Sequence, residues 1–277
     1  MSAAEKRQVF RRLHESCCFV IPNPWNVGTA RYLQGLGFKA LATTSSGYAH
    51  SIGYSDGEAT RDQALAHFRE TTQATDVPVN ADFENGFADD PDGVAANVKL
   101  CVETGVAGLS IEDATGDDAY PLYDFDVALA RVRAARKAID AVGGDVVFTA
   151  RTEGFIRNRP DLDETIRRLK AFADAGADCL YSPGIKTREQ IEATVKAVAP
   201  KPVNFLNSGA FTVSDLAAMG VRRISVGGTL ARVAMHAFIK SAREIAEQGK
   251  FDSFAGVISN AELNKFFRDD RVRRQKP

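Results

Sequence analysis

Short apolar runs recur along the chain, and each is followed by a longer segment with helical periodicity. Continuous or alternating apolar residues over a few positions are typical of strands, whereas apolar residues three or four positions apart are typical of amphipathic helices. The pattern predicts eight strands: Cys18–Ile21, Ala40–Thr43, Val77–Asp82, Gly108–Glu112, Val146–Arg151, Cys179–Ser182, Pro202–Leu206 and Arg223–Val226.

The segments between these runs predict helices. Successive strand starts lie about 29 residues apart on average, which is the length of one strand–helix unit. Glycine follows four of the helices directly before a strand, as in GLGF and DAGADC, and glycine readily adopts the left-handed conformation that ends a helix. The expected helices are Val27–Leu36, Arg61–Thr75, Pro91–Thr104, Asp126–Val142, Pro160–Ala175, Arg188–Val198, Thr212–Met219 and Leu230–Gln248.

Eight parallel strands with interleaved helices can close into a barrel. The expected fold class is therefore α/β, a (β/α)8 TIM barrel. An open doubly wound sheet is the alternative, and it is disfavoured because no G-x-G-x-x-G follows the first strand. We expect one α/β-barrel domain over 1–277, with an N-terminal helix at about 1–16 and a tail helix within about 250–277.

The tail is additional to the eight units. It contains a further predicted helix near Asn260–Arg268, and it is strongly apolar. Two destinations are open for its apolar side chains: contact with another copy of the chain, or cover for the outer face of the barrel. These side chains are Phe251, Phe254, Val257, Ile258, Leu263, Phe266 and Phe267.

Composition excludes several classes of protein. The 277 residues carry a formal net charge of −1, whereas a nucleic-acid-binding surface needs a basic excess. The chain contains no run of about 18 apolar residues, so no membrane span is expected. The four cysteines, Cys17, Cys18, Cys101 and Cys179, form no C-x-x-C pair, so neither a zinc site nor a disulfide framework is expected. The first residues lack the apolar centre of a secretory signal, so a cytoplasmic location is expected.

Polar residues gather where the predicted strands end, which is the end of a TIM barrel that holds reacting groups. Asp56, Asp82 and Glu112 would converge there, and several close carboxylates favour a hard divalent cation such as Mg2+. Arg151 offers a planar fork for a substrate carboxylate. The segment Ser45-Ser46-Gly47 offers hydroxyl and backbone N–H groups for a carboxylate or an oxyanion. Further candidates are Asn80 and Glu84 on the third strand, Glu153 after the fifth, and Asn204 and Asn207 on the seventh.

Each candidate also has a purely structural interpretation. Asp56 in YSDGE fits a turn, and Glu112-Asp113 fits a helix cap. Arg151 could pair with Glu112 or Glu153, and TSSG could be a helix-capping turn. The joint placement of these residues after strands two to five is what favours a functional site.

Two other kinds of catalysis find no support. A Ser–His–Asp hydrolase would need a G-x-S-x-G elbow, which is absent, and a Schiff-base aldolase would need a lysine on a strand. Of the four histidines, only His50 lies near the predicted mouth, while His14, His67 and His236 fall in predicted helices.

Four segments in order, TTSSGYAHSIGYSDGE, PVNADFENGF, GLSIEDATG and FTARTE, resemble the isocitrate lyase/phosphoenolpyruvate mutase superfamily. The resemblance runs from NPWNVGTAR to the tail. It implies an α/β barrel that binds Mg2+, with Mn2+ as an alternative, and a small α-keto acid. It also implies a homo-oligomer, a dimer or tetramer, that exchanges a C-terminal helix between subunits.

The resemblance also implies roles for individual residues. Ser45, Ser46 and Gly47 would hold the keto acid, and Arg151 would contact it. Asp56, Asp82 and Glu112 would hold Mg2+, largely through water. Position 80 departs from the superfamily's D-x-D, since Asn80 is neutral; its amide oxygen could still act as a metal ligand, with lower affinity.

The loop after Glu112, DATGDDAYPLYD, also departs from the superfamily. It lacks the K-K-C-G-H of the lyases and the gating loop of the mutases. Glu84, Tyr48, His50 or Tyr120 could supply a proton instead. The expected function is a Mg2+-dependent C–C lyase or decarboxylase acting on a small α-keto or hydroxy dicarboxylic acid through a pyruvate-like enolate, with Arg151 and Glu112 as catalytic residues. The alternatives are a phosphonopyruvate mutase or hydrolase, and a catalytically silent α-keto-acid-binding protein.

Overall fold

The computed structural model describes residues 1–15 and 18–274, and so leaves out Cys17 and the end of the N-terminal helix expected at about 1–16. Two compact units make up the chain, Met1–Gly228 and Thr229–Pro277. Each unit is described by itself. The single domain expected over 1–277 stays a prediction.

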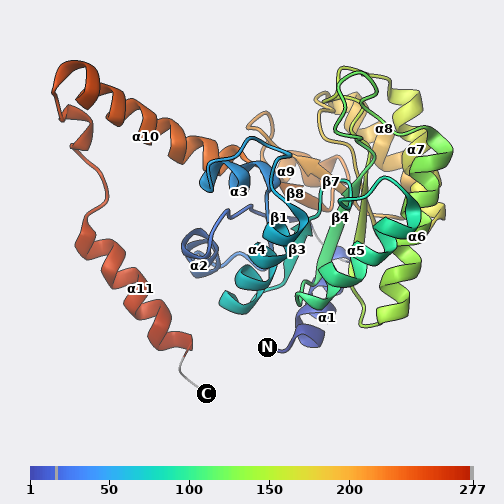
Figure 1. The fold of residues 1–277 in the computed structure, drawn as a ribbon, viewed down its shortest axis with the longest axis horizontal. Coiled ribbons are helices and arrows are strands. Elements are labelled where there is room, and N and C mark those ends of the chain that lie inside the picture. The colour runs from blue at the N-terminus through green and yellow to red at the C-terminus, as the bar shows by residue number, and fades with distance from the viewer. Residues whose placement is uncertain (16–17, 275–277) are drawn as a thin grey trace. The chain divides into compact units, whose positions relative to one another are not determined.

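Eight parallel strands form the first unit's sheet, in the order β1-β8-β7-β6-β5-β4-β3-β2 (Figure 1). The two outer strands meet, because Ala42 N donates a hydrogen bond to Pro22 O at 3.1 Å. The (β/α)8 TIM barrel is therefore confirmed, and the open sheet is not what forms. The strands are β1 (Phe19–Ile21), β2 (Leu41–Ala42), β3 (Val79–Asp82), β4 (Gly108–Glu112), β5 (Val147–Arg151), β6 (Cys179–Tyr181), β7 (Val203–Leu206) and β8 (Arg223–Ser225).

Helices connect successive strands, as the apolar periodicity predicts. Asn26, Thr60 and Thr187 cap α2, α4 and α8, each with its side chain accepting a hydrogen bond from the third helical residue. The glycines expected to end helices have positive φ, for example +95° at Gly37 and +100° at Gly176. The connecting helices are α2 (Val27–Gly35), α4 (Arg61–Ala74), α5 (Pro91–Glu103), α6 (Phe125–Val142), α7 (Leu162–Asp174), α8 (Arg188–Val198) and α9 (Val213–Ala218).

Two local predictions need correction. The helix expected to begin at Pro160 begins at Leu162, because Asp161 serves as its N-cap and accepts from Glu164 N at 2.9 Å. A short helix, α3 (Ser45–Ser51), follows β2 where only a binding or capping segment was expected. Thr44 caps it by accepting a hydrogen bond from Gly47 N.

The N-terminal helix α1 (Ala3–Glu15) closes one end of the barrel. Its Phe10 is fully buried and packs with Phe19 and Val147, the first residues of β1 and β5. Gly108 is required beside it, since a Cβ atom there would lie 2.6 Å from the Phe10 ring and 2.9 Å from Val147 O. The opposite end, where the strands finish, is therefore the accessible mouth.

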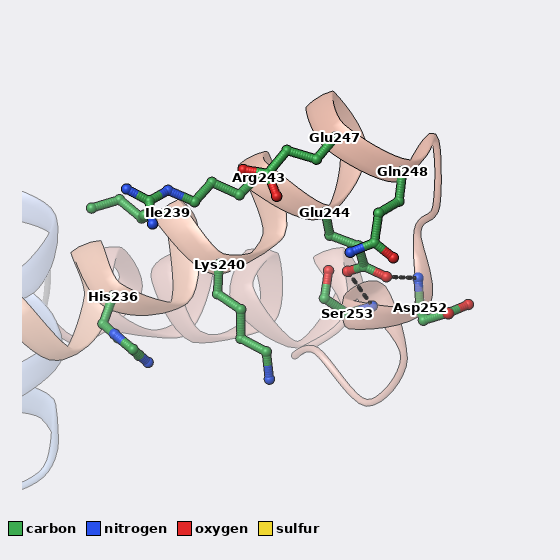
Figure 2. A pocket seen from close by; sticks show the side chains of 9 residues that line it. All are labelled: His236, Ile239, Lys240, Arg243, Glu244, Glu247, Gln248, Asp252 and Ser253. Carbon is green, nitrogen blue, oxygen red and sulfur yellow. Dashed lines mark hydrogen bonds between the residues drawn. The ribbon is translucent and has the colours of Figure 1, made fainter.

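The second unit contains α10 (Thr229–Gln248), η1 (Asp252–Phe254) and α11 (Asn260–Arg274). The carboxylate of Glu244 accepts hydrogen bonds from the backbone N–H groups of Asp252 and Ser253, which ties the turn to α10 (Figure 2). The predicted last helix near Asn260–Arg268 is confirmed and extends to Arg274. No residue of α10 is buried, and large apolar side chains stay exposed along the unit, among them Val233, Phe238, Phe251, Phe254 and Val257. None of the described helices combines the length and the apolar character that a bilayer crossing needs.

The free energy of unfolding should depend on pH because of His14 at the closed end of the barrel. Its Nδ1 lies 2.8 Å from Phe10 O and its Nε2 lies 3.3 Å from an Arg223 nitrogen. Burial, reinforced by the charge of Arg223, lowers the pKa of His14 to about 3. The unfolded chain therefore binds one more proton than the folded chain from about pH 6.5 down to about pH 3, so the free energy of unfolding should fall by up to about 1.4 kcal/mol per pH unit over that interval.

We expect His14→Gln to make this dependence shallower in urea unfolding measured at pH 7, 6 and 5. His236→Gln, on the exposed surface of α10, is the control and should keep the wild-type slope. Equal slopes for the two variants would show that His14 is not the group that titrates.

Candidate active site

Asp82 ends β3 at the mouth of the barrel and is held by three neighbouring elements. Its N–H donates to Thr43 Oγ1 at 2.9 Å, and its Oδ2 accepts from Ser45 N at 3.0 Å. Its Oδ1 accepts from Arg151 at 2.9 Å. Through its backbone N–H and its carboxylate, one residue thus joins the ends of β2, β3 and β5 and the start of α3.

Arg151 ends β5 and lies among three carboxylates. Its Nη1 contacts Asp82, its Nη2 lies 3.2 Å from Glu112 Oε2, and its Nε donates to Glu153 Oε1 at 2.8 Å. The guanidinium also lies 5.0 Å from the centre of the Tyr181 ring. Burial alone would lower the pKa of Arg151, but the charges of Glu153, Glu112 and Asp82 raise it well above its ordinary value. Arg151 is therefore a permanent cation with every guanidinium nitrogen facing a carboxylate.

The mouth nevertheless holds more carboxyl groups than cationic side chains. Burial together with Glu153 raises the pKa of Glu112 well above its ordinary value. Burial, Asp82 and Asp56 raise the pKa of Glu84 to about 8. Partial burial of its carboxyl group and the charge of Asp82 also raise the pKa of Asp56, although the residue as a whole lies on an exposed turn. These carboxyl groups resist ionising mainly because they are buried, and their negatively charged neighbours add to the effect.

Such a donor set suits a hard divalent cation, whose preferred ligands are oxygens. Asp56, Asp82 and Glu112 are the residues that would hold it. Among residues 1–15 and 18–274, no three His, Cys, Asp or Glu side chains already converge as a ready metal cluster. The reason is visible in the contacts, since Arg151 occupies oxygens of both Asp82 and Glu112.

Ser45 and Ser46 lie in the first turn of α3, directly above Asp82. Ser45 provides the N–H that binds Asp82, and Ser46 Oγ lies 3.2 Å from Thr44 Oγ1. The loop after β8 passes close by, because a Cβ atom on Gly228 would lie 2.5 Å from Ser46 Oγ. The capping interpretation of TSSG therefore holds for Thr44, while the two serines face the mouth carboxylates and the β8 loop.

Three predicted site residues lie apart from this cluster. Asn80 is buried two residues deeper on β3; its Nδ2 donates to Ala81 O, and its Oδ1 has no hydrogen-bond partner among the described residues. Asn204 is buried inside the barrel, where it contacts Ser225 and Arg223. Asn207 holds its own turn through Phe211 O and Gly209 N. The amides of Asn204 and Asn207 already hydrogen-bond to other parts of the barrel unit, and the amide of Asn80 lies below the mouth.

The four suggested proton donors separate clearly. Tyr48 stacks on His67, with ring centres 4.2 Å apart, and its hydroxyl donates to Gln63 O at 3.2 Å. Tyr120 is 75% exposed, and His50 is exposed on α3. Glu84 is half-buried at the mouth, with a left-handed backbone (φ +46°) and a carbonyl that accepts from Glu112 N at 2.9 Å. Glu84 is the candidate that the fold holds inside the cluster.

Sequence reasoning missed the roles of two further residues. Glu153 was named as a candidate after the fifth strand and as a possible partner of Arg151, without a role of its own; its side chain is 1% exposed and forms the floor of the ion cluster. Arg157, on the turn after β5, reaches Glu112 and Glu153 from the solvent side. The R-x-E spacing of Arg151 and Glu153 indicates that these two side chains can contact each other, but no sequence signal marks Arg157. Asp113, by contrast, binds Thr152, Glu153 N and Arg168, which is a structural network.

Comparison with known proteins gives a consistent picture. The profile of the family described as phosphoenolpyruvate phosphomutase matches residues 10–246. A Burkholderia cenocepacia J2315 protein, provisionally assigned as a lyase/mutase, has a solved structure with a TM-score of 0.91, 45% identity and 96% of each chain covered. Oxaloacetate acetylhydrolase with bound oxalate superposes with a TM-score of 0.83 at 27% identity, covering 98% of this chain and 96% of the other. The 2-methylisocitrate lyase of Escherichia coli K12 is 29% identical over 82% of this chain and 81% of its own length.

Removing Arg151 tests whether the ion cluster depends on it. We expect Arg151→Met to lower the free energy of unfolding by about 3–5 kcal/mol in chelator, because buried carboxylates would lose their shared cation. Arg188→Met is the matched control; it breaks an exposed pair with Glu192 and should cost about 1 kcal/mol or less. Urea unfolding measures both. A loss for Arg151→Met no greater than for the control would contradict the assigned role.

Proposed function

The chain belongs to the phosphoenolpyruvate phosphomutase family, within the isocitrate lyase/phosphoenolpyruvate mutase superfamily, and is an enzyme of that lyase/mutase class. From this premise we propose that it is a Mg2+-dependent carbon–carbon lyase or decarboxylase. Its substrate would be a small α-keto or hydroxy dicarboxylic acid, and the reaction would pass through a pyruvate-like enolate. The observation that carries the proposal is the Asp82–Arg151–Glu112 cluster at the barrel mouth.

Asp56, Asp82 and Glu112 would hold Mg2+, with Mn2+ as an alternative. When bound, the cation would polarise the keto-acid carbonyl and stabilise negative charge on the enolate oxygen. Asn80 lies deeper on the same face of β3, so it would act from below these residues. A divalent cation would also favour the ionised form of the mouth carboxyl groups, whose pKa values are raised by burial and by their negative neighbours.

The chain's own residues would bind and orient the substrate. Arg151 would pair with the substrate carboxylate by exchanging one of its present carboxylate partners, and Ser45, Ser46 and Gly47 would close over it from α3. Glu112 packs against Arg151 and would keep it aligned. With a pKa of about 8, Glu84 can keep a proton at neutral pH and is the mouth residue best suited to deliver it to the enolate carbon.

Relatives of this reaction class support the proposal, while the matching family profile, described as phosphoenolpyruvate phosphomutase, supports the mutase alternative. Besides those above, an oxaloacetate decarboxylase of Paraburkholderia xenovorans LB400 is 29% identical over 79% of this chain. Phosphonopyruvate hydrolase, at 24% identity, shows the shared fold alone. The loop DATGDDAYPLYD contains no lysine, cysteine or histidine, so the proton chemistry would differ from that of a lyase with the K-K-C-G-H loop. A silent keto-acid-binding protein is another alternative, and a measurement of turnover decides it.

Thermal unfolding with and without Mg2+ tests the proposal. At 100 times the Kd, oxaloacetate should stabilise the protein by about 2.7 kcal/mol, or ~5–10 °C for a chain of this size, only when Mg2+ is present. Asp82→Asn, which keeps the shape of the side chain, should abolish this shift, while Asp174→Asn on the exposed surface of α7 should retain it.

NMR of the same mixture should show a C–C cleavage product. Binding without product would favour the silent binder. No shift with oxaloacetate, pyruvate or 2-oxoglutarate would refute the proposed function. A shift that phosphonopyruvate alone produces would favour the mutase or hydrolase.

We further propose that the protein is a homo-oligomer whose contacts involve the second unit. The support is the absence of any buried residue in α10 together with its large exposed apolar side chains. Phe238, 66% exposed, is the side chain to test.

Phe238→Asp should lower the molar mass measured by light scattering from that of a dimer or tetramer towards that of one chain. Leu36→Asp changes an equally exposed apolar residue of the barrel unit and should leave the mass unchanged. If both variants keep the wild-type mass, the contact does not depend on this helix.

A further inference from the structure

Arg157 lies on a rigid turn at the rim of the mouth. Its backbone N–H donates to Glu153 O at 3.0 Å, and Arg159 N donates to Gly154 O at 2.8 Å, which closes the turn. Asn158 between them has a left-handed backbone, φ +58°. The turn therefore fixes where the Arg157 side chain leaves the backbone.

The Arg157 guanidinium faces the ion cluster without hydrogen-bonding to it. Its Nη2 lies 3.7 Å from Glu112 Oε1, and its Nε lies 3.9 Å from Glu153 Oε2. Both distances exceed those of hydrogen bonds. Arg157 Nε and Glu153 Oε2 are both buried and have no hydrogen-bond partner among the described residues. A cation is thus held near the cluster by charge, and its partly exposed guanidinium makes no hydrogen bond to these carboxylates.

Arg151 and Arg157 differ in how many of their guanidinium nitrogens are paired closely with carboxylates. Arg151, with 14% of its side chain exposed, faces a carboxylate with each of its three nitrogens. Arg157 is 38% exposed, on the solvent side of the same carboxylates. The two guanidinium groups approach the two oxygens of one carboxylate, that of Glu112. The span between them is therefore short.

We propose that Arg157 binds the second carboxylate of a dicarboxylic substrate and so selects dicarboxylates over monocarboxylates. This inference rests on the proposed function. Arg151 would take the carboxylate next to the keto group, and Arg157 would take the distal one across Glu112. A guanidinium fork suits a carboxylate because it can donate two parallel hydrogen bonds. In this arrangement Arg157 is a specificity-determining residue.

The test compares Kd values for oxaloacetate and pyruvate by thermal-shift titration in excess Mg2+. Arg157→Met should raise the Kd of oxaloacetate about 10- to 100-fold, the effect of losing a hydrogen bond to a charged group. It should change the Kd of pyruvate less than about threefold, and Arg157→Lys should give an intermediate oxaloacetate Kd.

Arg159→Met is the matched control, because it removes the same charge two residues later on the same turn. It should leave both Kd values close to wild type. Equal weakening of both ligands by Arg157→Met would overturn the inference, since Arg157 would then act only on the carboxylate cluster. If Arg159→Met raised the Kd of oxaloacetate as much as Arg157→Met, the inference would also fail, because the loss of one positive charge would then explain both effects.

The wild-type protein separates the two proposals. If it binds neither ligand in Mg2+, the proposed function fails and the role of Arg157 fails with it. If it binds both ligands and Arg157→Met shows no selectivity, only the role of Arg157 fails.

Discussion

The burial of one guanidinium among several carboxylates is the constraint on which this mouth depends. Charges at the end of a barrel are partly removed from water, so each must be balanced by a neighbour. Arg151 contacts Asp82, Glu112 and Glu153, and thereby ties the ends of β3, β4 and β5 into one cluster. The cluster holds more carboxyl groups than arginines, and this excess of oxygen ligands makes it suitable for a divalent cation.

The barrel brings these groups together through its strand register. Glu112 and Arg151 are paired residues on neighbouring strands, and Asp82 pairs with Ser110 two residues before Glu112. Parallel strands end at the same side of the sheet, so carboxylates far apart in the chain become neighbours. At the other end, Phe10 of α1 packs against the strands. The groups proposed for chemistry therefore all lie at one end of the barrel.

Local composition explains which predictions succeeded. The strands and most helices lie where apolar periodicity, capping residues and glycines place them, because those preferences act over a few residues. The helix was predicted to begin at Pro160, before its observed start at Leu162, because Asp161 was not recognised as its N-cap. The short α3 was missed because seven residues carry little periodicity. Asn204 and Asn207 were assigned to the site by strand position alone, yet their amides hold Arg223 and a turn.

By itself, the sequence determined the order of strands and helices, the barrel, the family and the carboxylates and arginine of the mouth. Each of these follows from short-range pattern or from residues that end a strand. Only the tertiary structure decided how these charges pair: that Arg151 is shared by three carboxylates, that Asn80 lies below the mouth, that Glu84 lies within it and that Arg157 reaches back to it. Such pairings join residues as far as 69 positions apart, and their energies depend on burial and distance, which a linear pattern does not contain.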